Sequence, residues 1–530
     1  MAIKLPEFLL MLFKHKFPLV LLIAAVAITR WVFRSHYLYD LDSVNFALAM
    51  QRFDPRVHQP HPPGYFLYIC LGRLLNMVFH DANLALVVLS ILASCGVVVV
   101  LYAITLEWFG SMAARFAGIL FLFSPLAWFH GTVALTYIVE AFFSVLLGYF
   151  CWRSVRGEQR FVIHAAIVLG LSAGVRPSSL LFLAPLFLFS LRKAHPTERL
   201  VGLAALIATL TAWFVPMIAV AGGVQVYFEA LASLWGTVPS KETVFNASPA
   251  YSIARAFTIV FIFFLCFGAA SLAPLIATRR NSDDRVKRNF TLVWILPALC
   301  FFTFGYLKFV NSGYLLLLFP PAAIWIGLWV SEWYVRAGWP PAIKLTVIGV
   351  GLALNVLIFV AAPLYCSYGR VRQFEAELEK TQAAIQKIAS ANNTVIVGLD
   401  SHFNGFRHAG YYLPDYLTVE YPEVNLKEGR RVFAMHQRDT QLLASLPVAS
   451  YTRFVFFPLP DGKSYRDYLE TVTAKLPKQR INRISFEGRD YVTGPISDLP
   501  LLFPDAVRTS DEGVYAPFQS GTGPVNNRSQ

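Results

Sequence analysis

Residues Tyr39–Tyr65 read YDLDSVNFALAMQRFDPRVHQPHPPGY and follow the first apolar run of the chain, Phe17–Phe33. The stretch carries two aspartates two positions apart, Asp40 and Asp42, and closes on a His-Pro-Pro-Gly sequence that begins at His61. Most of the chain after it is strongly apolar. A polar loop with acids beside such segments is either an ordinary solvated connection or a place for chemistry, and the rest of the sequence must decide between the two.

The composition predicts a polytopic membrane protein. Of the 530 residues, 56% are hydrophobic and only 15% are charged, which gives more apolar surface than a soluble protein of this size can bury. The net charge of +13 does not indicate nucleic-acid binding, because the basic residues form short clusters between apolar runs, where they orient spans. The cysteines are scattered and show neither a zinc-site spacing nor a disulfide framework. Lysines precede the first apolar run without a cleavage site, which predicts an uncleaved anchor.

Eleven apolar runs are long enough, or nearly so, to cross a membrane. They lie at 17–34, 83–106, 112–130, 134–152, 161–175, 178–191, 199–221, 253–277, 289–307, 312–330 and 343–365. A twelfth run, 64–79, is shorter and polar in places. If it does not cross, most loop arginines and lysines fall on one side, whereas crossing would reverse the bias. The positive-inside rule therefore predicts that 64–79 is an interfacial amphipathic helix, that the N-terminus is cytoplasmic, and that the acidic loop and the C-terminal part face outside.

After about residue 366 the sequence changes to the pattern of a small α/β domain. Helices are predicted at Arg370–Ser390 and Tyr465–Lys475, and strands at 394–399, 416–420, 431–434 and 453–457, followed by one final strand formed by 484–486 with 491–492. The absence of a glycine-rich phosphate loop argues against a nucleotide site there. The predicted organisation is a membrane domain at 1–366, whose first outer loop with its interfacial helix is 35–82. An extracytoplasmic α/β domain follows at 367–508, and a disordered tail at 509–530.

This topology brings several isolated ionisable residues to one membrane face. Arg176 and Lys308 each lie at an outer turn, and Glu140 lies about four residues into a span. An ionisable group inside a span is costly and is therefore a functional candidate. Each also has a structural interpretation: Glu140 as the partner of a nearby cation, and the two cations as side chains that extend to the interface. Their convergence with the loop acids favours a functional site.

Transfer of a sugar from a polyprenyl phosphate requires this combination of groups. A carboxylate must take a proton from the acceptor, which we expect Asp42 to do. Cations must hold the phosphate as charge grows on the leaving oxygen, and Arg176, Lys308 and His61 are the candidates. Such a reaction needs no nucleotide.

At these residues the chain resembles the membrane glycosyltransferases of the GT-C type. The likeness is to the branch that uses polyprenyl-phosphate sugars, which includes the protein mannosyltransferases and the lipid A aminoarabinose transferase. The motifs are Asp42-Ser43-Val44-Asn45-Phe46-Ala47, His61-Pro62-Pro63-Gly64-Tyr65, Val175-Arg176-Pro177, and Lys308 followed by Tyr314 and Phe319-Pro320-Pro321. Glu140 resembles the acid near the start of the family's fourth span. The resemblance covers roughly 17–365 and is more diffuse at Tyr411-Tyr412-Leu413-Pro414.

The resemblance implies a GT-C fold of about eleven helices and an inverting transfer. The catalytic candidates are Asp42, Asp40 and Glu140; the donor-phosphate candidates are Arg176, Lys308 and His61; the further donor or acceptor contacts are Tyr65, Tyr314 and His58. The sequence departs from the family pattern where Ser43 replaces a second acid, where Asp40 is an added acid, and where His61 replaces a lysine. These departures leave the donor and the need for a divalent metal open, and no cofactor is predicted.

The predicted function is therefore transfer of a sugar from a polyprenyl phosphate to a protein, lipid or polysaccharide acceptor on the extracytoplasmic side. The alternative is a transporter or flippase of lipid-linked intermediates, in which charges would be expected near the middle of the bilayer. A bacterial cell membrane is favoured over the endoplasmic reticulum, and no nucleic-acid partner is expected.

Overall fold

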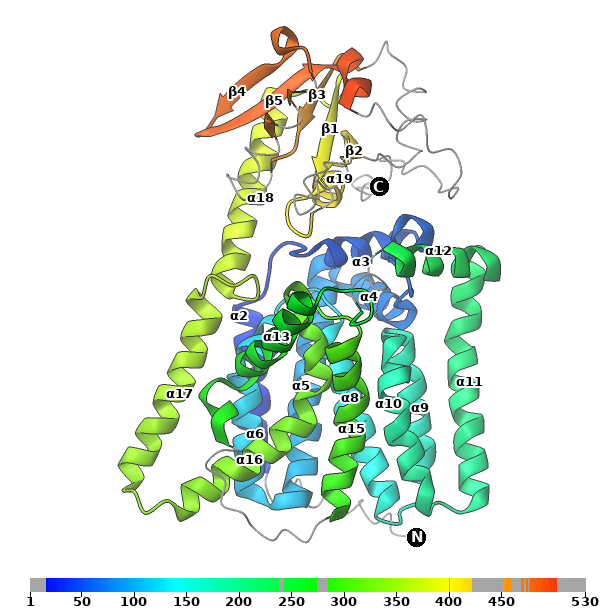
Figure 1. Cartoon of the computed structure of the whole chain (residues 1–530), viewed down its shortest axis with the longest axis vertical. Coiled ribbons are helices and arrows are strands. Elements are labelled where there is room, and N and C mark those ends of the chain that lie inside the picture. Colours follow the sequence, from blue (N-terminus) through cyan, green and yellow to red (C-terminus); the bar gives the residue numbers. More distant parts are fainter. Residues whose placement is uncertain are drawn as a thin grey trace. The chain divides into compact units, whose positions relative to one another are not determined.

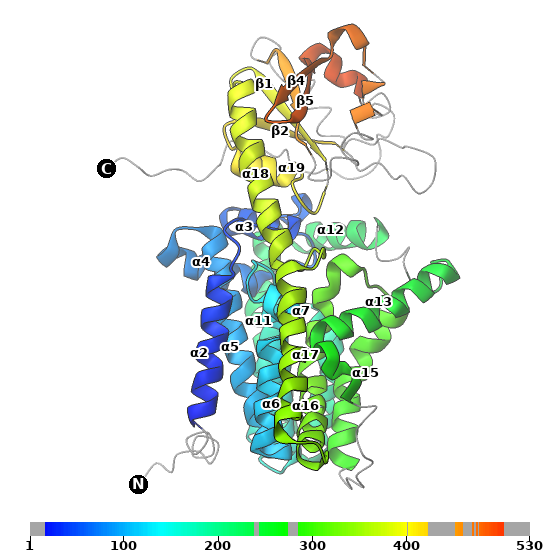
Figure 2. The same ribbon diagram turned by 90° about the vertical axis from the view of Figure 1, so that its left-hand side faces the viewer.

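The computed structural model describes residues 16–237, 243–273, 285–399, 401–421, 451–458, 469–470, 473–474 and 476–502 (Figures 1 and 2). Its α-helices are α2 (Lys16–Val32), α3 (Leu41–Gln51), α4 (Phe66–Phe79), α5 (Ala82–Phe109), α6 (Ser111–Leu122), α7 (Pro125–His130), α8 (Tyr137–Val155), α9 (Phe161–Val175), α10 (Ser178–Ser190), α11 (Pro196–Val220), α12 (Val224–Thr237), α13 (Pro249–Phe267), α15 (Arg285–Phe304), α16 (Phe319–Arg336), α17 (Pro341–Ala361), α18 (Tyr368–Ile388) and α19 (Phe406–Tyr412). Its 3₁₀ helices are η1 (Pro55–Val57), η2 (Leu191–Lys193), η4 (Gly268–Leu272), η5 (Phe309–Leu317), η7 (Lys478–Arg480) and η8 (Ile496–Leu502). The strand predicted at 431–434, most of the helix predicted at Tyr465–Lys475, and the tail at 509–530 lie outside the described residues.

The chain divides into two compact units that do not follow the order of the sequence. Unit 1 consists of Met1–Ser35 and Pro62–Val371, and unit 2 consists of His36–His61 and Arg372–Gln530. The segment with the two loop aspartates, which the sequence analysis placed in the membrane domain, thus groups with the C-terminal residues.

Unit 1 is a helical bundle organised around α5, which packs against α2, α4, α6, α8 and α16. The pairs α8 with α9, α9 with α11 and α10 with α15 extend the bundle, and these helices run alongside one another in Figure 1. Gly148 on α8 permits one of the closest approaches, since a Cβ there would lie 2.1 Å from the Trp294 ring on α15. A residue without a side chain is therefore needed at this crossing.

Several helices of unit 1 have the length and composition of membrane spans. Among the described residues, five qualify on these grounds, and up to six if one bent pair is a single span. They are α5, α8, α11, α13 with η4, and α17, and the bent pair is η5 with α16. Each of the eleven predicted spans contains at least part of a helix, but several of these helices are too short to cross alone. A membrane protein with several apolar helices is confirmed, and the number eleven stays a prediction.

Local sequence explains two breaks that the apolar pattern did not predict. Within 112–130, α6 ends and α7 begins, because the Ser124 Oγ accepts a hydrogen bond from the Ala127 N–H at 3.3 Å and Pro125 takes the first helical position. Within 312–330, η5 and α16 meet at an angle of 71°. Pro320 and Pro321 lie in the first turn of α16, where the missing N–H of proline needs no partner within the helix. The same prolines would break a helix that continued from η5 into α16, because their rings clash with the preceding turn.

Two helices of unit 1, α4 and α12, lie across one end of the bundle in both views (Figures 1 and 2). On α4 the side chains of Leu74, Met77 and Val78 are exposed. The Tyr227 hydroxyl on α12 donates to the carbonyl of Pro63, just before α4, at 2.9 Å. These exposed apolar side chains suit an interfacial helix, and the interfacial position of 64–79 stays a prediction.

The segment η5 is held in unit 1 by a chain of polar contacts. The Trp294 Nε1–H on α15 donates to Ser144 Oγ on α8 at 2.9 Å, and the Ser144 hydroxyl donates to the Leu317 carbonyl at the same distance. Both side chains are buried. Because a buried hydroxyl that donates and accepts is fully used, these bonds fix η5 relative to α8. This matters for the site because η5 carries Tyr314 and begins next to Lys308.

Unit 2 contains a five-stranded sheet in the order β2-β1-β3-β5-β4. The strands are β1 (Thr394–Leu399), β2 (Leu417–Tyr421), β3 (Arg453–Phe456), β4 (Asn482–Phe486) and β5 (Arg489–Pro495), and they overlap ranges predicted as strands. β1 pairs in parallel with β2 and β3, and β5 pairs antiparallel with β3 and β4. Its core is formed by Val395, Val397, Leu399, Leu417, Val419, Phe454, Phe456, Leu469, Leu476, Val492 and Leu499. The run of apolar, largely β-branched residues in β1 suits a central strand buried on both faces.

Candidate functional site

In unit 2, the start of α3 carries the acidic motif. The first two backbone N–H groups of the helix are both bonded: Leu41 donates to the His402 carbonyl and Asp42 donates to the Asp40 carboxylate, each at 2.9 Å. Such groups have no partner within a helix, so these bonds fix where α3 begins. Asp40 is therefore the N-cap residue, and Asp42 projects from the first turn.

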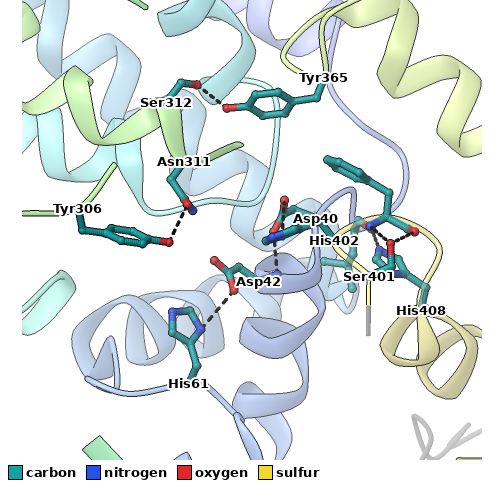
Figure 3. A network of polar contacts seen from close by, with 12 residues as sticks. Asp40, Asp42, His61, Tyr306, Asn311, Ser312, Tyr365, Ser401, His402 and His408 are labelled. Carbon is teal, nitrogen blue, oxygen red and sulfur yellow. Dashed lines mark hydrogen bonds and ion pairs between the residues drawn. The ribbon is translucent and has the colours of Figure 1, made fainter. Parts of the chain in front are cut away.

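Asp42 and His61 face each other in unit 2 (Figure 3). His61 Nδ1 lies 3.2 Å from Asp42 Oδ1, and the side chains are 17% and 26% exposed, respectively. Asp42 is thus open enough to meet a substrate and has an imidazole as its neighbour. The structure places His61 against the predicted base, and its predicted contact with a phosphate stays a prediction.

Asp40 is much less accessible than Asp42, and its environment is different. Its Oδ2 lies 4.0 Å from the Nδ1 of His402. Burial raises the pKa of Asp40 from 3.8 to about 6; the nearby Asp42 also raises it, while His402 and the bond from the Asp42 amide oppose the rise. Asp40 consequently changes charge close to neutral pH, which sequence alone did not predict.

The residues around Asp40 and Asp42 are anchored to α18 and α19 by hydrogen bonds to the backbone. The Leu38 N–H donates to the Tyr412 hydroxyl at 2.8 Å, and the His408 Nε2 lies 3.1 Å from the Leu38 carbonyl. On α18, Glu375 accepts a bond from the His36 N–H at 2.5 Å. The C-terminal residues thus hold the acidic segment in its conformation.

The second half of the acidic segment has a structural explanation. Asp54 is buried and binds Arg56 through two bonds of 2.8 and 2.9 Å, with Arg52 at 3.2 Å. His58, a predicted substrate contact, ends η1 in a left-handed conformation with φ 57°. The neighbouring carbonyl of Val57 accepts from the Arg407 Nη2 at 2.6 Å. These groups stabilise the turn that leads back to His61.

In unit 1, Arg176 and Glu140 form a buried ion pair. Arg176 Nε lies 3.4 Å from Glu140 Oε2, and both side chains are less than 5% exposed. The Arg176 Nη1 donates to Thr136 Oγ1 at 2.9 Å, and the Ser179 hydroxyl donates to Glu140 Oε1 at 2.6 Å. Charge and hydrogen bonds are thus matched on both sides, which a buried pair requires.

Three tyrosine rings surround the guanidinium of Arg176. Its Cζ lies 4.1 Å from the ring centroid of Tyr314, 4.5 Å from that of Tyr137 and 5.8 Å from that of Tyr65. The negative ring faces attract the cation, and this attraction is strongest where water is excluded. The structure therefore brings together four predicted site residues of unit 1: Glu140, Arg176, Tyr65 and Tyr314.

Lys308 lies immediately before η5 and is partly buried. Nearby in unit 1, the buried Arg255 donates from Nη1 to the carbonyl of Gly305 at 2.8 Å. Sequence reasoning missed Arg255, although a lone arginine inside an apolar run was a sufficient signal. It also missed His402, which had no such signal because it lies in a polar loop.

The buried His130 at the end of α7 is a further residue that the sequence analysis did not select. Its ring packs edge-on against the ring of Tyr137, with 4.8 Å between the centroids. Tyr137 is one of the three tyrosines around the Arg176 guanidinium. Within the described ranges, no three His, Cys, Asp or Glu side chains are close enough to hold a metal ion. The chemical groups on offer are therefore an accessible carboxylate beside an imidazole in unit 2, and cations with aromatic rings in unit 1.

Part of the sequence matches a known protein family. Residues 55–199 match the family model described as the protein O-mannosyl-transferase TMEM260 N-terminal domain. The comparison with curated proteins found no match.

Solved structures of membrane glycosyltransferases are similar to this chain. The crystal structure of ArnT from Cupriavidus metallidurans in the apo state has a TM-score of 0.52 and 11% identity, covering 90% of this chain and 97% of that one. The same protein bound to undecaprenyl phosphate gives a TM-score of 0.51 and 10% identity with the same coverage. An archaeal oligosaccharyltransferase, AglB from Archaeoglobus fulgidus in complex with an inhibitory peptide and a dolichol-phosphate, gives 0.45 and 12%, covering 83% and 69%. The likeness to ArnT shows a GT-C fold, and the resemblance to glycosyltransferases stated from the sequence is confirmed.

Proposed function

We propose that this chain is an integral-membrane glycosyltransferase that moves a sugar from a polyprenyl-phosphate donor to an acceptor on the extracytoplasmic side. The observation that carries the proposal is Asp42, an accessible carboxylate at the start of α3 with His61 3.2 Å away. The relatives support it: ArnT has been crystallised with undecaprenyl phosphate, and the matched family is one of O-mannosyl-transferases.

In the proposed reaction Asp42 accepts the proton of the acceptor hydroxyl or amine as the acceptor atom bonds to the anomeric carbon. The bond between that carbon and the phosphate oxygen breaks, and the electron pair leaves with the polyprenyl phosphate. One displacement of this kind inverts the anomeric centre. The role of Asp42 is that of a general base, which needs an ionised and accessible carboxylate.

The phosphate requires cations as its negative charge grows. Lys308, Arg176 and His61 are the proposed groups, and Tyr65, Tyr314 and His58 are proposed contacts to donor or acceptor. Both permanent cations, Lys308 and Arg176, are proposed phosphate ligands, and Arg176 also pairs with Glu140 at 3.4 Å. Arg176 and Glu140 then shape the aromatic surface that Tyr65 and Tyr314 present.

Donor consumption tests the proposal directly. Purified full-length protein in lipid nanodiscs is incubated with a panel of polyprenyl-phosphate sugars, and each donor is followed by mass spectrometry. We expect one donor to disappear with release of polyprenyl phosphate, and Asp42→Asn to slow this release. Movement of intact donors across vesicle membranes without consumption would support the flippase alternative and contradict the transferase. Repeating the assay with a chelator determines whether a divalent metal is needed.

We further propose eleven spans, a cytoplasmic N-terminus, an interfacial α4 and an extracytoplasmic domain within 367–508. The support is the clustering of arginine and lysine in alternate loops. A cysteine scan tests this in a background without the six native cysteines, all of which are free. In intact cells, a membrane-impermeant maleimide is expected to label Glu229→Cys and Arg483→Cys, and to label Lys193→Cys only after permeabilisation. Labelling of Lys193→Cys from outside would reverse the topology.

A further inference from the structure

Residue His402 touches the start of α3 in two ways. Its carbonyl accepts the hydrogen bond from the Leu41 N–H at 2.9 Å, and its imidazole faces the Asp40 carboxylate, with 4.0 Å between Nδ1 and Oδ2. The other oxygen of Asp40 caps the Asp42 N–H. A residue from the C-terminal part of unit 2 thus contacts both groups that define the first turn of α3 (Figure 3).

We propose that His402 is a positioning residue for Asp42, and that it acts by holding Asp40 in the ionised form that caps α3. The effect of His402 on catalysis rests on the proposed function. Its contacts with Leu41 and Asp40 do not, because they are observed within unit 2. The C-terminal part of the chain then acts on the reaction centre through His402 as well as through the bonds that anchor the acidic segment.

The physical reason is the difference between the two forms of Asp40 as a cap. A carboxylate accepts a backbone N–H bond more strongly than a protonated carboxyl does, because charge-assisted bonds are shorter and stronger. The positive end of the helix dipole also favours a negative cap. The imidazole of His402, whose Nδ1 lies 4.0 Å from Oδ2, favours the charged form of Asp40. His402 therefore favours the state in which the first turn, and with it Asp42, is most firmly fixed.

Two groups oppose the effect of burial and of the Asp42 carboxylate on the pKa of Asp40: the imidazole of His402 and the backbone N–H of Asp42. Asp42 on α3 raises the pKa of Asp40, as burial does, and His402 lowers it. On α19, burial lowers the pKa of His408 to about 4, so that this ring is neutral near physiological pH. Arg407 on the same helix bonds to the Val57 carbonyl, and on α18 Arg372 pairs with Glu375. His61 lies against Asp42 rather than Asp40.

The first test needs no substrate and reads the titration of Asp40 from stability. Because the folded state raises the pKa of Asp40 from 3.8 to about 6, the proton stabilises the fold, and this contribution is lost as pH rises through about 6. The difference in melting temperature between the full chain and its Asp40→Asn variant should therefore decrease as the pH rises to about 6, and it should stay constant above that pH. Asparagine is a suitable comparison because it caps helices as well as aspartate does.

In the His402→Gln background, the difference in melting temperature between the protein with Asp40 and its Asp40→Asn variant should stop falling at a pH about 1 unit higher than in the wild type. The reason is that a cation within about 4–6 Å lowers a carboxyl pKa by 1 unit or more. His402→Lys, which keeps a positive charge at all relevant pH values, should return the midpoint to the wild-type value or below. A midpoint that His402→Gln leaves unchanged would overturn the proposal. His36→Ala, which removes an exposed histidine of the same unit, is the matched control and should change nothing.

The second test uses the acidic limb of the pH–rate profile once the donor is known. We expect His402→Gln to move this acidic limb to a pH about 1 unit higher, while kcat at pH 8 stays nearly unchanged. His402→Lys should return the limb to its wild-type position. A uniform loss of activity at every pH would indicate a merely structural residue and would overturn the proposal. If no donor is consumed, the proposed function fails while the stability test still decides the role of His402.

Discussion

Asp42→Asn is expected to lower turnover by roughly 10²–10⁴-fold, which is the usual cost of removing a positioned general base. The amide keeps the shape of the side chain and cannot accept the proton. Asp42 sits in the first turn of α3, whose N-cap is Asp40, so the substitution leaves the cap intact. The melting temperature should therefore be close to wild type. The measurement is single-turnover release of polyprenyl phosphate by purified protein.

Asp40→Asn is the matched comparison, because it removes an equal charge two residues away. Since asparagine is also a good N-cap, we expect a much smaller loss at pH 8 and a flatter acidic limb. A normal rate for Asp42→Asn together with a large loss for Asp40→Asn would assign the base to Asp40. If neither change matters, Glu140 becomes the leading catalytic candidate.

His61→Gln separates two roles for the imidazole beside Asp42. An effect confined to the KM of the donor would indicate phosphate binding. An effect on kcat with an unchanged KM would indicate that His61 acts on the carboxylate 3.2 Å away.

Arg176→Ala is expected to cause a large loss of stability in unit 1. It leaves Glu140 buried without its ion-pair partner, which typically costs about 3–5 kcal/mol. It also removes the cation that the rings of Tyr65, Tyr137 and Tyr314 enclose. The measurement is thermal unfolding in one detergent at fixed protein concentration. Arg176→Lys should retain part of the stability, since it keeps the charge but not the planar fork.

The control for this experiment is the double change Glu140→Gln with Arg176→Met. Replacing both charges removes the unpaired ion, so the double variant should be more stable than Arg176→Ala. An Arg176→Ala protein that unfolds at the wild-type temperature would show that the pair is not structural. Its donor affinity would then test whether Arg176 binds the phosphate.

The sequence predicted the membrane class and the strand positions well because both depend on local patterns. Long apolar runs and short runs of β-branched residues are both visible in a short window of sequence. The break at Ser124 was invisible in this way, since the apolar content continues on both sides and only the cap reveals it. An ion pair between Glu140 and a nearby cation was one interpretation of the sequence, but helical spacing alone could not identify that cation as Arg176, 36 positions away.

The grouping of the acidic segment with the C-terminal residues was beyond the reach of the sequence. Asp40 and His402 are more than 300 positions apart, and nothing in either local pattern indicates contact. The raised pKa of Asp40 has the same origin, because burial is a property of the assembled unit. His61 was assigned to a phosphate because the family motif has a lysine there, whereas the position of its ring beside Asp42 depends on the turn built by Asp54.

The bond between the Leu38 N–H and the Tyr412 hydroxyl joins groups 374 residues apart, and this separation has a consequence during synthesis. Ribosomes add roughly 5–20 residues per second, so roughly 20–75 s pass between the emergence of one partner and that of the other. During that interval the newborn polypeptide has its aspartates but lacks the platform that fixes them. Chains released early, or cut by a protease before residue 412, should therefore insert into a membrane and yet never acquire activity. The C-terminal part of the chain thus ensures that only complete chains hold the acidic segment in its active conformation.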